Sequence, residues 1–560
     1  MTKQNTQVVK TNTGAATLTS AWYLSSSKYP LRSGNILAPY FSGQDIFRQI
    51  ANSIKTAKTS LDIVCWGFDP AMPIIRDGNA WSEDKSYGGL LIKAAERGVK
   101  VRLLLWYYGP ANSREKNLPG MLGSIGMVKV KRSTKEATNY SSKWFNAVQA
   151  GKYPNIKVVF RDIKDQGNIS GEDERSGEES ITLNIPSDHQ KSFVADYGTP
   201  NAHGYVMGHN SLTEYWDTAS MNHDERLREP GKGPWHDLSL YVKGPILVDL
   251  NANFCESWDD NCDNSSHSKG DKLTKVRNGM ASMMRASPGS SMAQIVRTRP
   301  DKTVNKAKEK EIRRAYLQVA ANPRRYVLIV NQYFQYARWV RELKKHFQAY
   351  KQKGARRQIY IFAFTPTPQS DGMMFRTHQM ANELGVSEQV GKGDEEFYKQ
   401  LPNGNYELIS KGKSNGAAPK QLYKDLQALG IETVFCNLKT KVNGQEPKDI
   451  YIHAKLMVID DEFFTLGSAN LNIRSMAVDS ELNIISDDDS TAFLFRNTLL
   501  GRYCGGSITQ PGMYGDMGEF FKKFKRLSER NRELIPEKVR ITGHAASFAD
   551  SRSAGGTRVA

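Results

Sequence analysis

Two short stretches of the chain place a histidine, a lysine and an aspartate at the same spacing. They are His189, Lys191 and Asp196 in the first stretch, and His453, Lys455 and Asp460 in the second. The whole chain has only ten histidines. A repeated H-x-K-x-x-x-x-D pattern therefore indicates a duplicated functional element.

These residue types suit chemistry on an anionic phosphoryl group. Residues 451–460 are rich in apolar and β-branched side chains, which predicts a strand, and side chains two apart on a strand share one face. Each histidine should therefore emerge beside its lysine. An imidazole can attack phosphorus or move a proton, while ammonium and amide groups hold the oxygens. Two such sets facing each other supply a nucleophile and a leaving-group acid without a metal.

A small-residue element ending in asparagine follows each motif. Residues 207–210 read MGHN and residues 467–470 read GSAN. We expect Asn210 and Asn470 to hold phosphate oxygens together with the two lysines. Gly208 and Ser468 are expected to line the phosphate pocket.

The doubled motif followed by GSAN resembles the phospholipase D superfamily. Residues 467–476 read GSANLNIRSM, with DSE at 479–481, and residues 331–334 read NQYF as in the two-lobed lipid-cleaving members. Residues 235–245 resemble the strand and turn that close the first half. The resemblance covers roughly residues 35 to 500. It implies an α/β fold of two similar lobes, each a mixed sheet flanked by helices, with the active site at the pseudo-twofold interface.

The resemblance also implies separate roles for the two histidines. By this resemblance, His189 is expected to be the nucleophile, and His453 is expected to act as the general acid and base. The first copy departs from the family pattern, because Met207 stands where glycine is usual and His209 fills the variable position. Its histidine, lysine, aspartate and asparagine are all present, so we expect an active site.

Each catalytic histidine needs a partner on its second ring nitrogen to fix its tautomer. We expect Asp237 to pair with His189 and Glu481 with His453, and Asp479 competes for the second role. The motif aspartates, Asp196 and Asp460, are expected to be structural. Each lies an odd number of residues from its histidine and so points to the other face of a regular strand. Arg297 and Arg474 are either pocket residues or members of core ion pairs.

Strands and helices alternate along both halves, which predicts a sheet covered on both faces. The expected helices are 41–59, 88–97, 309–321, 338–351 and 419–429, and the expected strands are 61–68, 99–106, 156–160, 326–330, 358–364 and 431–435. The predicted organisation is an N-terminal segment (1–34), lobe 1 (35–262), a linker (263–290), lobe 2 (291–510, with an insertion at 365–417) and a C-terminal basic helix with its tail (511–560). Residues 165–180 should form an acidic mobile loop. The insertion either covers a lipid-binding mouth or is surface elaboration.

Toward the C-terminus, Phe520, Phe521 and Phe524 form an apolar stripe flanked by lysines. Such a helix lies on a membrane or docks on its own core, and we favour docking. Residues 543–560 contain few large apolar residues and are expected to be disordered.

Composition narrows the class of partner. The 560 residues are 39% hydrophobic and 24% charged, and the net charge of +18 favours anionic partners such as a phospholipid surface or nucleic acid. No apolar run approaches the roughly 20 residues of a membrane span, and the N-terminus lacks a secretion signal. Five cysteines leave open a disulfide between Cys255 and Cys262, with free thiols favoured. We expect no metal and no cofactor.

The leading function is hydrolysis, or transfer to an alcohol, at the headgroup phosphodiester of a phospholipid. The pattern resembles the phospholipase D branch of antibacterial type VI secretion effectors. That resemblance implies synthesis in the bacterial cytoplasm, export without a signal peptide and action at the membrane or periplasm of a target cell. It also implies a cognate immunity protein and a secretion-spike delivery protein as partners. The alternatives are a cardiolipin-synthase-type phosphatidyltransferase, a nuclease and, more distantly, a binding protein on a decayed scaffold. Nucleic acid is not the expected partner.

Overall fold

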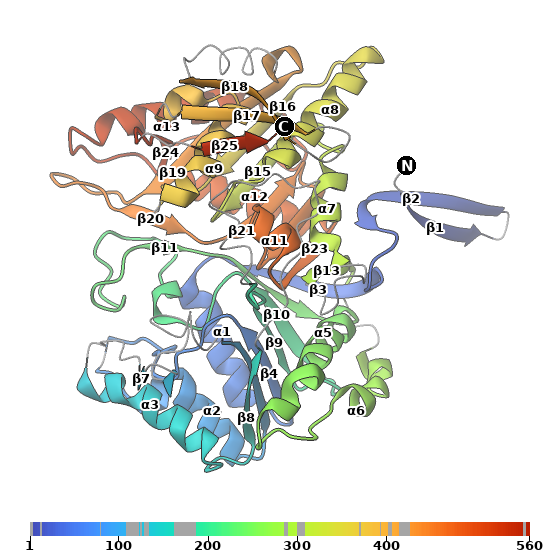
Figure 1. The fold of residues 1–560 in the computed structure, drawn as a ribbon, viewed down its shortest axis with the longest axis vertical. Helices are drawn as coiled ribbons and strands as arrows, with labels where there is room; N and C mark the ends of the chain where they lie inside the picture. Colours follow the sequence, from blue (N-terminus) through green and yellow to red (C-terminus); the bar gives the residue numbers. More distant parts are fainter. Residues whose placement is uncertain are drawn as a thin grey trace.

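The computed structural model shows two lobes stacked along the long axis of the molecule (Figure 1). The description below covers residues 4–11, 14–78, 80–107, 122–123, 126–127, 134–161, 186–284, 289–299, 309–368, 371–391, 394–400, 406–413, 426–552 and 556–559. The predicted acidic loop at 165–180 and most of the predicted helix at 419–429 lie outside these residues.

Lobe 1 is built on a seven-stranded mixed sheet. Its strands, in spatial order, are β8 (Ile156–Arg161), β5 (Lys100–Trp106), β4 (Ser60–Cys65), β9 (Ser192–Ala195), β10 (His203–Met207), β12 (Ser239–Lys243) and β3 (Arg32–Tyr40). Pairs β8–β5 and β5–β4 are parallel, and all later pairs are antiparallel. The central strands β4 and β9 are buried at every position, as expected for strands covered on both faces.

Lobe 2 repeats this arrangement. Its strands, in spatial order, are β19 (Ile431–Lys439), β16 (Ile359–Phe364), β15 (Tyr326–Asn331), β21 (Lys455–Ile459), β22 (Phe463–Gly467), β23 (Glu481–Ser486) and β13 (Ser291–Arg299). Again the first two pairs are parallel and the rest antiparallel. The predicted pair of similar lobes, each a mixed sheet flanked by helices, is therefore confirmed.

Backbone pairing joins the two sheets. Strand β13 of lobe 2 pairs antiparallel with β3 of lobe 1. A second seam pairs β11 (Trp235–His236) in parallel with β20 (Asp449–Ile452). The predicted limits of the lobes, at residues 262 and 291, fall just after helix α5 (Ile246–Asn261) and at the first residue of β13.

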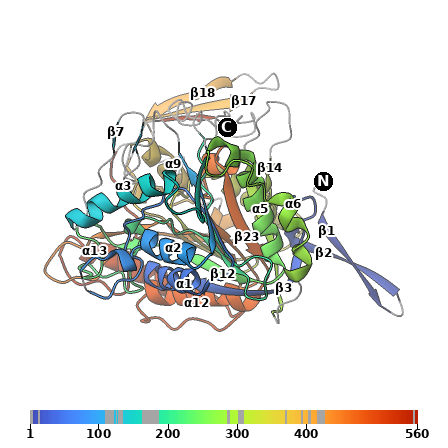
Figure 2. The same ribbon diagram turned by 90° about the horizontal axis from the view of Figure 1, so that it is seen from below.

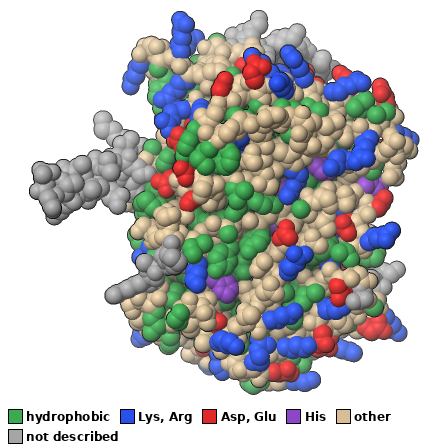
Figure 3. All heavy atoms as spheres, turned by 180° about the vertical axis from the view of Figure 1, so that it is seen from behind, with side chains coloured by type: hydrophobic (Ala, Val, Ile, Leu, Met, Phe, Trp, Pro, Cys, Tyr) green, Lys and Arg blue, Asp and Glu red, His purple; other side chains and the backbone are tan. Residues whose placement is uncertain are grey.

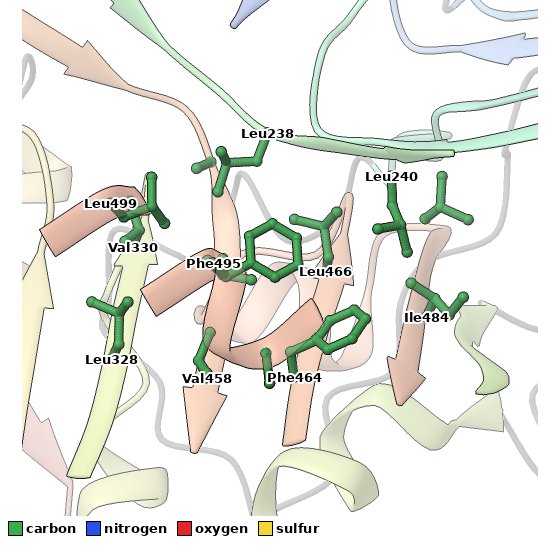
Figure 4. Close-up of a cluster of buried hydrophobic side chains, with 14 of the residues drawn as sticks. Leu238, Leu240, Leu328, Val330, Val458, Phe464, Leu466, Ile484, Phe495 and Leu499 are labelled. Carbon is green, nitrogen blue, oxygen red and sulfur yellow. The ribbon is translucent and has the colours of Figure 1, made fainter. Parts of the chain in front are cut away.

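Helices cover both faces of this joined sheet. Helices α1 (Gly43–Thr56), α2 (Tyr87–Glu96) and α3 (Lys135–Gln149) cover one face of lobe 1, while α7 (Glu311–Val319) and α8 (Ala337–Gln352) cover the corresponding face of lobe 2 (Figure 1). The opposite faces share one core, to which α5 and α12 (Asp489–Tyr503) contribute. Figure 4 shows Leu238 and Leu240 of lobe 1 close to Phe495 and Leu466 of lobe 2. The lobes thus share one hydrophobic interior.

The basic C-terminal helix α13 (Gly518–Leu534) docks on this interior. Phe520, Phe521 and Phe524 are buried and contact Phe362 of β16. Full burial of one such side chain stabilises a fold by about 1.5–3 kcal/mol. Docking on the core was the favoured prediction, and the structure agrees with it.

The prediction of a disordered C-terminal tail is wrong for its first part. Strand β24 (Ala545–Ser547) adds to the edge of lobe 2 beside β19, and Phe548 is buried against Phe435. Small residues at 545–547 fit beneath α13, which a composition argument does not detect.

The insertion in lobe 2 contains helix α9 (Asp371–Glu383) and strands β17 (Asp394–Gln400) and β18 (Tyr406–Lys413). Glu383 of α9 pairs with Arg341 and Lys344 of α8, so the end of this helix is tied to the lobe. At the other end of the chain, β1 (Gln4–Thr11) and β2 (Gly14–Leu24) form a ribbon that projects from the body, as Figure 2 shows.

Two further observations concern membranes and thiols. Among the described residues, no helix combines the length and the apolar character that a bilayer crossing requires. All five cysteines, including Cys255 and Cys262, are buried free thiols.

Candidate active site

A cleft of about 380 Å³ opens where the two lobes meet. Both motif histidines border it. Its lining comprises Trp66, Trp106, Ser187, His189, Tyr215, Gln332, Tyr333, His453, Asn470, Asn472, Arg474, Ser475 and Asp479. The duplicated elements therefore converge on one site, although they lie far apart in the sequence.

At each histidine, the backbone amide donates a hydrogen bond to a residue of the other lobe. The amide of His189 donates to the carbonyl of Ser480 at 2.8 Å, and the amide of His453 donates to the carbonyl of His236 at 2.7 Å. The strand predicted across 451–460 is accordingly interrupted at His453, with β20 before it and β21 after it. These two hydrogen bonds between the lobes fix both histidines at the lobe interface.

The predicted histidine–carboxylate pairing is wrong, because each partner comes from the opposite lobe. Nδ1 of His189 lies 2.9 Å from Oε1 of Glu481, and Nδ1 of His453 lies 2.7 Å from Oδ2 of Asp237. Sequence proximity suggested partners within a lobe. The crossed backbone pairing instead places β23 beside the first histidine and β11 beside the second. In both pairs the carboxylate occupies Nδ1, which leaves Nε2 for chemistry.

Glu481 is itself fixed by two hydroxyl groups. Ser468 Oγ donates to one oxygen at 2.5 Å, and Ser475 Oγ donates to the other at 2.6 Å. Ser468 was predicted to line the phosphate pocket, but its hydroxyl is engaged behind the histidine and holds the carboxylate instead. The amide of Leu482 also donates to Ser468 Oγ, at 3.0 Å.

Gly208 has the equivalent supporting place in lobe 1. A Cβ atom at this position would lie 2.2 Å from Oδ1 of Asp237. Glycine therefore leaves space for the carboxylate that holds His453. The prediction that Gly208 lines the phosphate pocket is wrong, because this residue is absent from the cleft lining and lies against Asp237.

The two lysines lie behind the cleft lining, beside their histidines, and are almost completely buried. Nζ of Lys191 donates to the carbonyl of His189 at 2.6 Å, and Nζ of Lys455 donates to Oε1 of Gln332 at 2.9 Å and to the carbonyl of His453. Each lysine thus lies beside its own histidine, as the spacing predicts. Burial lowers the pKa of both side chains, and each lysine is placed to attract an anion when it is protonated.

The two asparagines complete the polar base. Oδ1 of Asn210 accepts from the amide of Gly67 at 3.0 Å, while its buried Nδ2 has no hydrogen-bond partner among the described residues. Nδ2 of Asn470 donates to Gln332 at 3.4 Å, and Asn470 borders the cleft. Asn470 can therefore turn an N–H donor toward an oxygen in the cleft, whereas Asn210 is buried behind the lining with an N–H that is unpaired within the described part of the chain.

The motif aspartates do not reach the cleft. Asp196 and Asp460 adopt left-handed backbone conformations, with φ of 53° and 58°, at the ends of β9 and β21. Asp196 accepts amide hydrogen bonds from Lys58 and Thr59, ahead of β4. Asp460 accepts from the amides that open β15, including Tyr326 at 2.7 Å. Each carboxylate thereby ties its histidine-bearing strand to the neighbouring strand.

The arginines and the competing aspartate also have defined partners. Arg297 is buried and pairs with Glu256 and Glu309 away from the cleft lining. Arg474 pairs with Asp479 at 2.6 Å on the cleft wall, and Asp479 also accepts the amide of Ser187. Asp479 is therefore not the partner of His453.

Burial and the clustered cations shift the titration of the site. Burial lowers the pKa of His189, although the neighbouring Glu481 opposes this. Burial, with Lys455 and Lys191 nearby, lowers the pKa of His453 well below its usual value. Burial also lowers the pKa of Lys191 to about 8 and raises that of Asp237 to about 7. At neutral pH both imidazoles are therefore neutral in the free protein, which a nucleophile requires.

The surroundings of the two histidines differ. The side chain of His189 is 17% exposed and that of His453 is 3% exposed. The ring of Trp235 stacks on His453 at 5.5 Å, and the Tyr215 ring meets it edge-on at 4.7 Å. One histidine faces the open cleft, and the other is enclosed by aromatic rings.

Sequence reasoning assigned no role to Tyr215 or Gln332. Gln332 falls within the quoted NQYF stretch, and it bridges Lys455 and the hydroxyl of Tyr451. Tyr215 follows Asn210 on a short 3₁₀ turn (Thr213–Tyr215), with no motif to mark it. Only the folded arrangement brings these side chains to the site.

Comparison with known proteins agrees with the geometry. A family model described as cardiolipin synthase, PLD-like domain, matches residues 399–499. Phospholipase D alpha 1 of Oryza sativa subsp. japonica is 24% identical over 552 residues, covering 81% of this chain and 61% of that protein. Phospholipase D A of Dictyostelium discoideum is 23% identical over 495 residues, covering 82% of this chain and 34% of that protein. The chain thus spans less than two thirds of the length of either relative.

Among solved structures, the phosphatidylserine synthase of Haemophilus influenzae Rd KW20 aligns with a TM-score of 0.43 and 13% identity. The alignment covers 91% of this chain and 96% of that one.

Two matching lobes each contribute a histidine to one cleft, and each histidine is backed by a lysine of its own lobe and a carboxylate of the opposite lobe. They define a two-lobed α/β protein with a duplicated histidine–lysine site. This chain belongs to the phospholipase D superfamily.

Proposed function

We propose that the protein cleaves the headgroup phosphodiester of membrane phospholipids through a phosphohistidine intermediate. The phosphatidyl group is then transferred to water or to an alcohol. One observation carries the proposal. Two histidines, each held at Nδ1 by a carboxylate of the opposite lobe, border a single cleft above two buried lysines. This arrangement supplies two reactive nitrogens and a fixed positive base for one phosphate.

The difference in exposure favours His189 as the nucleophile. Its ring is the more accessible of the two, and the lowered pKa keeps its Nε2 unprotonated. His453 is enclosed and lies closest to Lys455, with Nζ 3.2 Å from Nε2. An enclosed imidazole suits proton transfer, which requires a fixed partner and exclusion of bulk water.

The reaction then has two balanced steps. In the first, Nε2 of His189 attacks phosphorus, the bond from phosphorus to the leaving oxygen breaks, and His453 gives that oxygen a proton. In the second, water or an alcohol attacks phosphorus, its proton passes to His453, and the bond to His189 breaks. Lys191, Lys455, Asn210 and Asn470 stabilise the charge on the non-bridging oxygens in both steps. The charge of the bound diester favours the protonated form of His453 that the first step needs.

Three observations support a phospholipid as the substrate. The named relatives are phospholipases D, and the net charge is +18. Figure 3 shows Lys and Arg side chains spread over one face of the molecule, with Asp, Glu and hydrophobic side chains among them. Such a surface is attracted to anionic bilayers. The description of the matching family model favours cardiolipin-synthase-type transfer as the second candidate.

The test offers the purified protein three substrates: vesicles of defined phospholipids, the same vesicles with a primary alcohol or phosphatidylglycerol, and plasmid DNA. We expect phosphatidic acid from the first and a transphosphatidylation product from the second. Activity should persist after exhaustive chelation, because lysine and amide groups can stabilise the transition-state charge. Nicked plasmid without lipid cleavage would support a nuclease instead. A loss of activity restored by zinc or magnesium would contradict the mechanism.

We further propose that the protein acts as an exported antibacterial effector on the membrane of a target cell, neutralised in the producer by an immunity protein. The proposal rests on the sequence resemblance to secretion effectors and on the basic surface. Fused to a periplasmic export signal, the wild type should reduce bacterial survival by orders of magnitude. Cytoplasmic expression should be tolerated better.

The matched control for this test is the exported His453→Ala variant, which should be harmless at equal abundance. Toxicity that persists in this variant would separate killing from catalysis. Equal survival of cells exporting wild type and variant would argue against the effector role and leave the enzymatic proposal standing.

A further inference from the structure

The Nε2 nitrogen of His453, which the proposed reaction uses, has a hydroxyl group beside it. The hydroxyl of Tyr215 lies 3.3 Å from Nε2, while Asp237 holds Nδ1. Tyr215 and His453 both border the cleft, so this hydrogen bond lies at the cleft wall. Among the described residues, the ring of His189 has no corresponding hydroxyl partner.

The direction of this hydrogen bond follows from the surroundings. Burial raises the pKa of the Tyr215 phenol well above its ordinary value, so the hydroxyl keeps its proton and donates. His453 is neutral at the same pH, because burial and the cations around it disfavour the imidazolium. The ring nitrogen facing Tyr215 is then an acceptor, and the ring proton lies on the side of Asp237.

The ionisable groups around His453 come from both lobes. They are Asp237, Lys191, His189, His209 and Tyr215 from lobe 1, and Lys455 and Tyr451 from lobe 2. Of these, only Tyr215, Asp237 and Lys455 have side-chain atoms within hydrogen-bond distance of the ring nitrogens. Burial lowers the pKa of Lys455 well below its usual value, and its Nζ is engaged by Oε1 of Gln332 and by the carbonyl of His453. The phenol is therefore the neutral donor at Nε2.

We propose that Tyr215 is the positioning residue of the acid–base histidine: its hydroxyl holds His453 in one tautomer with Nε2 facing the cleft, and yields that place to the oxygen that leaves or attacks phosphorus. The proposal rests on the proposed two-histidine reaction and adds a residue to it. The 3₁₀ turn that carries Tyr215 begins three residues after Asn210. A single short segment thus supplies both a phosphate-binding amide and the hydroxyl that aligns the proton-transfer group.

The test compares Tyr215→Phe with Tyr205→Phe. The first keeps the ring that packs against His453 and removes only the hydroxyl. The second removes a buried hydroxyl that bonds to Ser53 at 2.9 Å in the core of lobe 1. The ¹⁵N resonances of His453 are followed without substrate, assigned by their absence in His453→Asn. Cleavage of phospholipid vesicles and the amount of phosphoenzyme are followed against pH.

With Tyr215→Phe, we expect the Nε2 resonance of His453 to move toward that of an unbonded nitrogen. A hydrogen bond to the neutral ring lowers its pKa, so its loss should move the acidic limb of phosphohistidine breakdown up by about half to one pH unit. Turnover should fall roughly tenfold, with phosphoenzyme accumulating. Tyr205→Phe should change none of these.

An unchanged ¹⁵N spectrum and an unchanged pH profile in Tyr215→Phe would overturn the inference. If the wild type cleaves no phospholipid, the proposed substrate fails, and the resonance shift still tests the hydrogen bond. A fall in turnover with an unshifted pH profile and spectrum would assign Tyr215 to packing alone, which also contradicts the proposal.

Discussion

Replacing either His189 or His453 by alanine is expected to lower turnover by at least about 10⁴-fold, since each removes a covalent or proton-transfer step. Both rings border the cleft and neither belongs to the hydrophobic core, so the fold should persist. Single-turnover reaction with radiolabelled phospholipid, followed by an alkaline quench, measures the phosphoenzyme. We expect label on His189 in the wild type and none in His189→Ala.

His203→Ala is the matched control, because this histidine lies at the start of β10 and bonds to Ser53 away from the cleft. Its turnover should match that of the wild type. Label recovered on His453 would reverse the assigned roles. Wild-type turnover in either catalytic variant would rule out a mechanism that needs both histidines.

Glu481→Gln and Asp237→Asn should each reduce turnover by about 10²- to 10⁴-fold, but at different steps. Glu481 holds the nucleophile, so its loss should slow formation of the phosphohistidine. Asp237 holds the proposed acid–base histidine and strengthens it as a base, so its loss should slow breakdown more than formation, and labelled protein should accumulate. Rapid-quench measurement of both steps distinguishes the two variants.

The crossed pairing is what this comparison tests. If each carboxylate served the histidine of its own lobe, the two variants would exchange their kinetic behaviour. Stability provides a separate check. Because the pKa of Asp237 is raised to about 7, its carboxylate costs stability as the pH rises from about 4 through 7. Asp237→Asn should therefore have a Tm at pH 8 no lower than that of the wild type.

Much of the fold could be predicted from hydrophobic periodicity. Strands such as β15 and helices such as α8 depend on local patterns, and the structure places them within a few residues of the predicted limits. Strand β24 could not be predicted in this way. Its small residues form a strand only because α13 and β19 lie beside it.

The candidate site shows the same difference between features set by local sequence and features set by distant contacts. The motif spacing predicts that each lysine lies beside its histidine, because both belong to one local stretch of chain. Pairing between His189 and Glu481 depends on how strands from different lobes cross, and the sequence carries no local signal for that. Tyr215 and Trp235 reach His453 in the same way. The partners of the two histidines were missed because they depend on contact between lobes, whereas Gln332 meets Lys455 within lobe 2.

The joined sheet has a mechanical consequence. The seams β3–β13 and β11–β20, with the amide bonds of His189 and His453, fix the two halves to each other by main-chain hydrogen bonds. A hinge opening at the cleft would break these bonds and split a shared hydrophobic interior. The distance between the two imidazoles is therefore fixed by the backbone. Under the proposed function, a phospholipid diester therefore has to leave its bilayer to reach two imidazoles whose separation is set by the backbone.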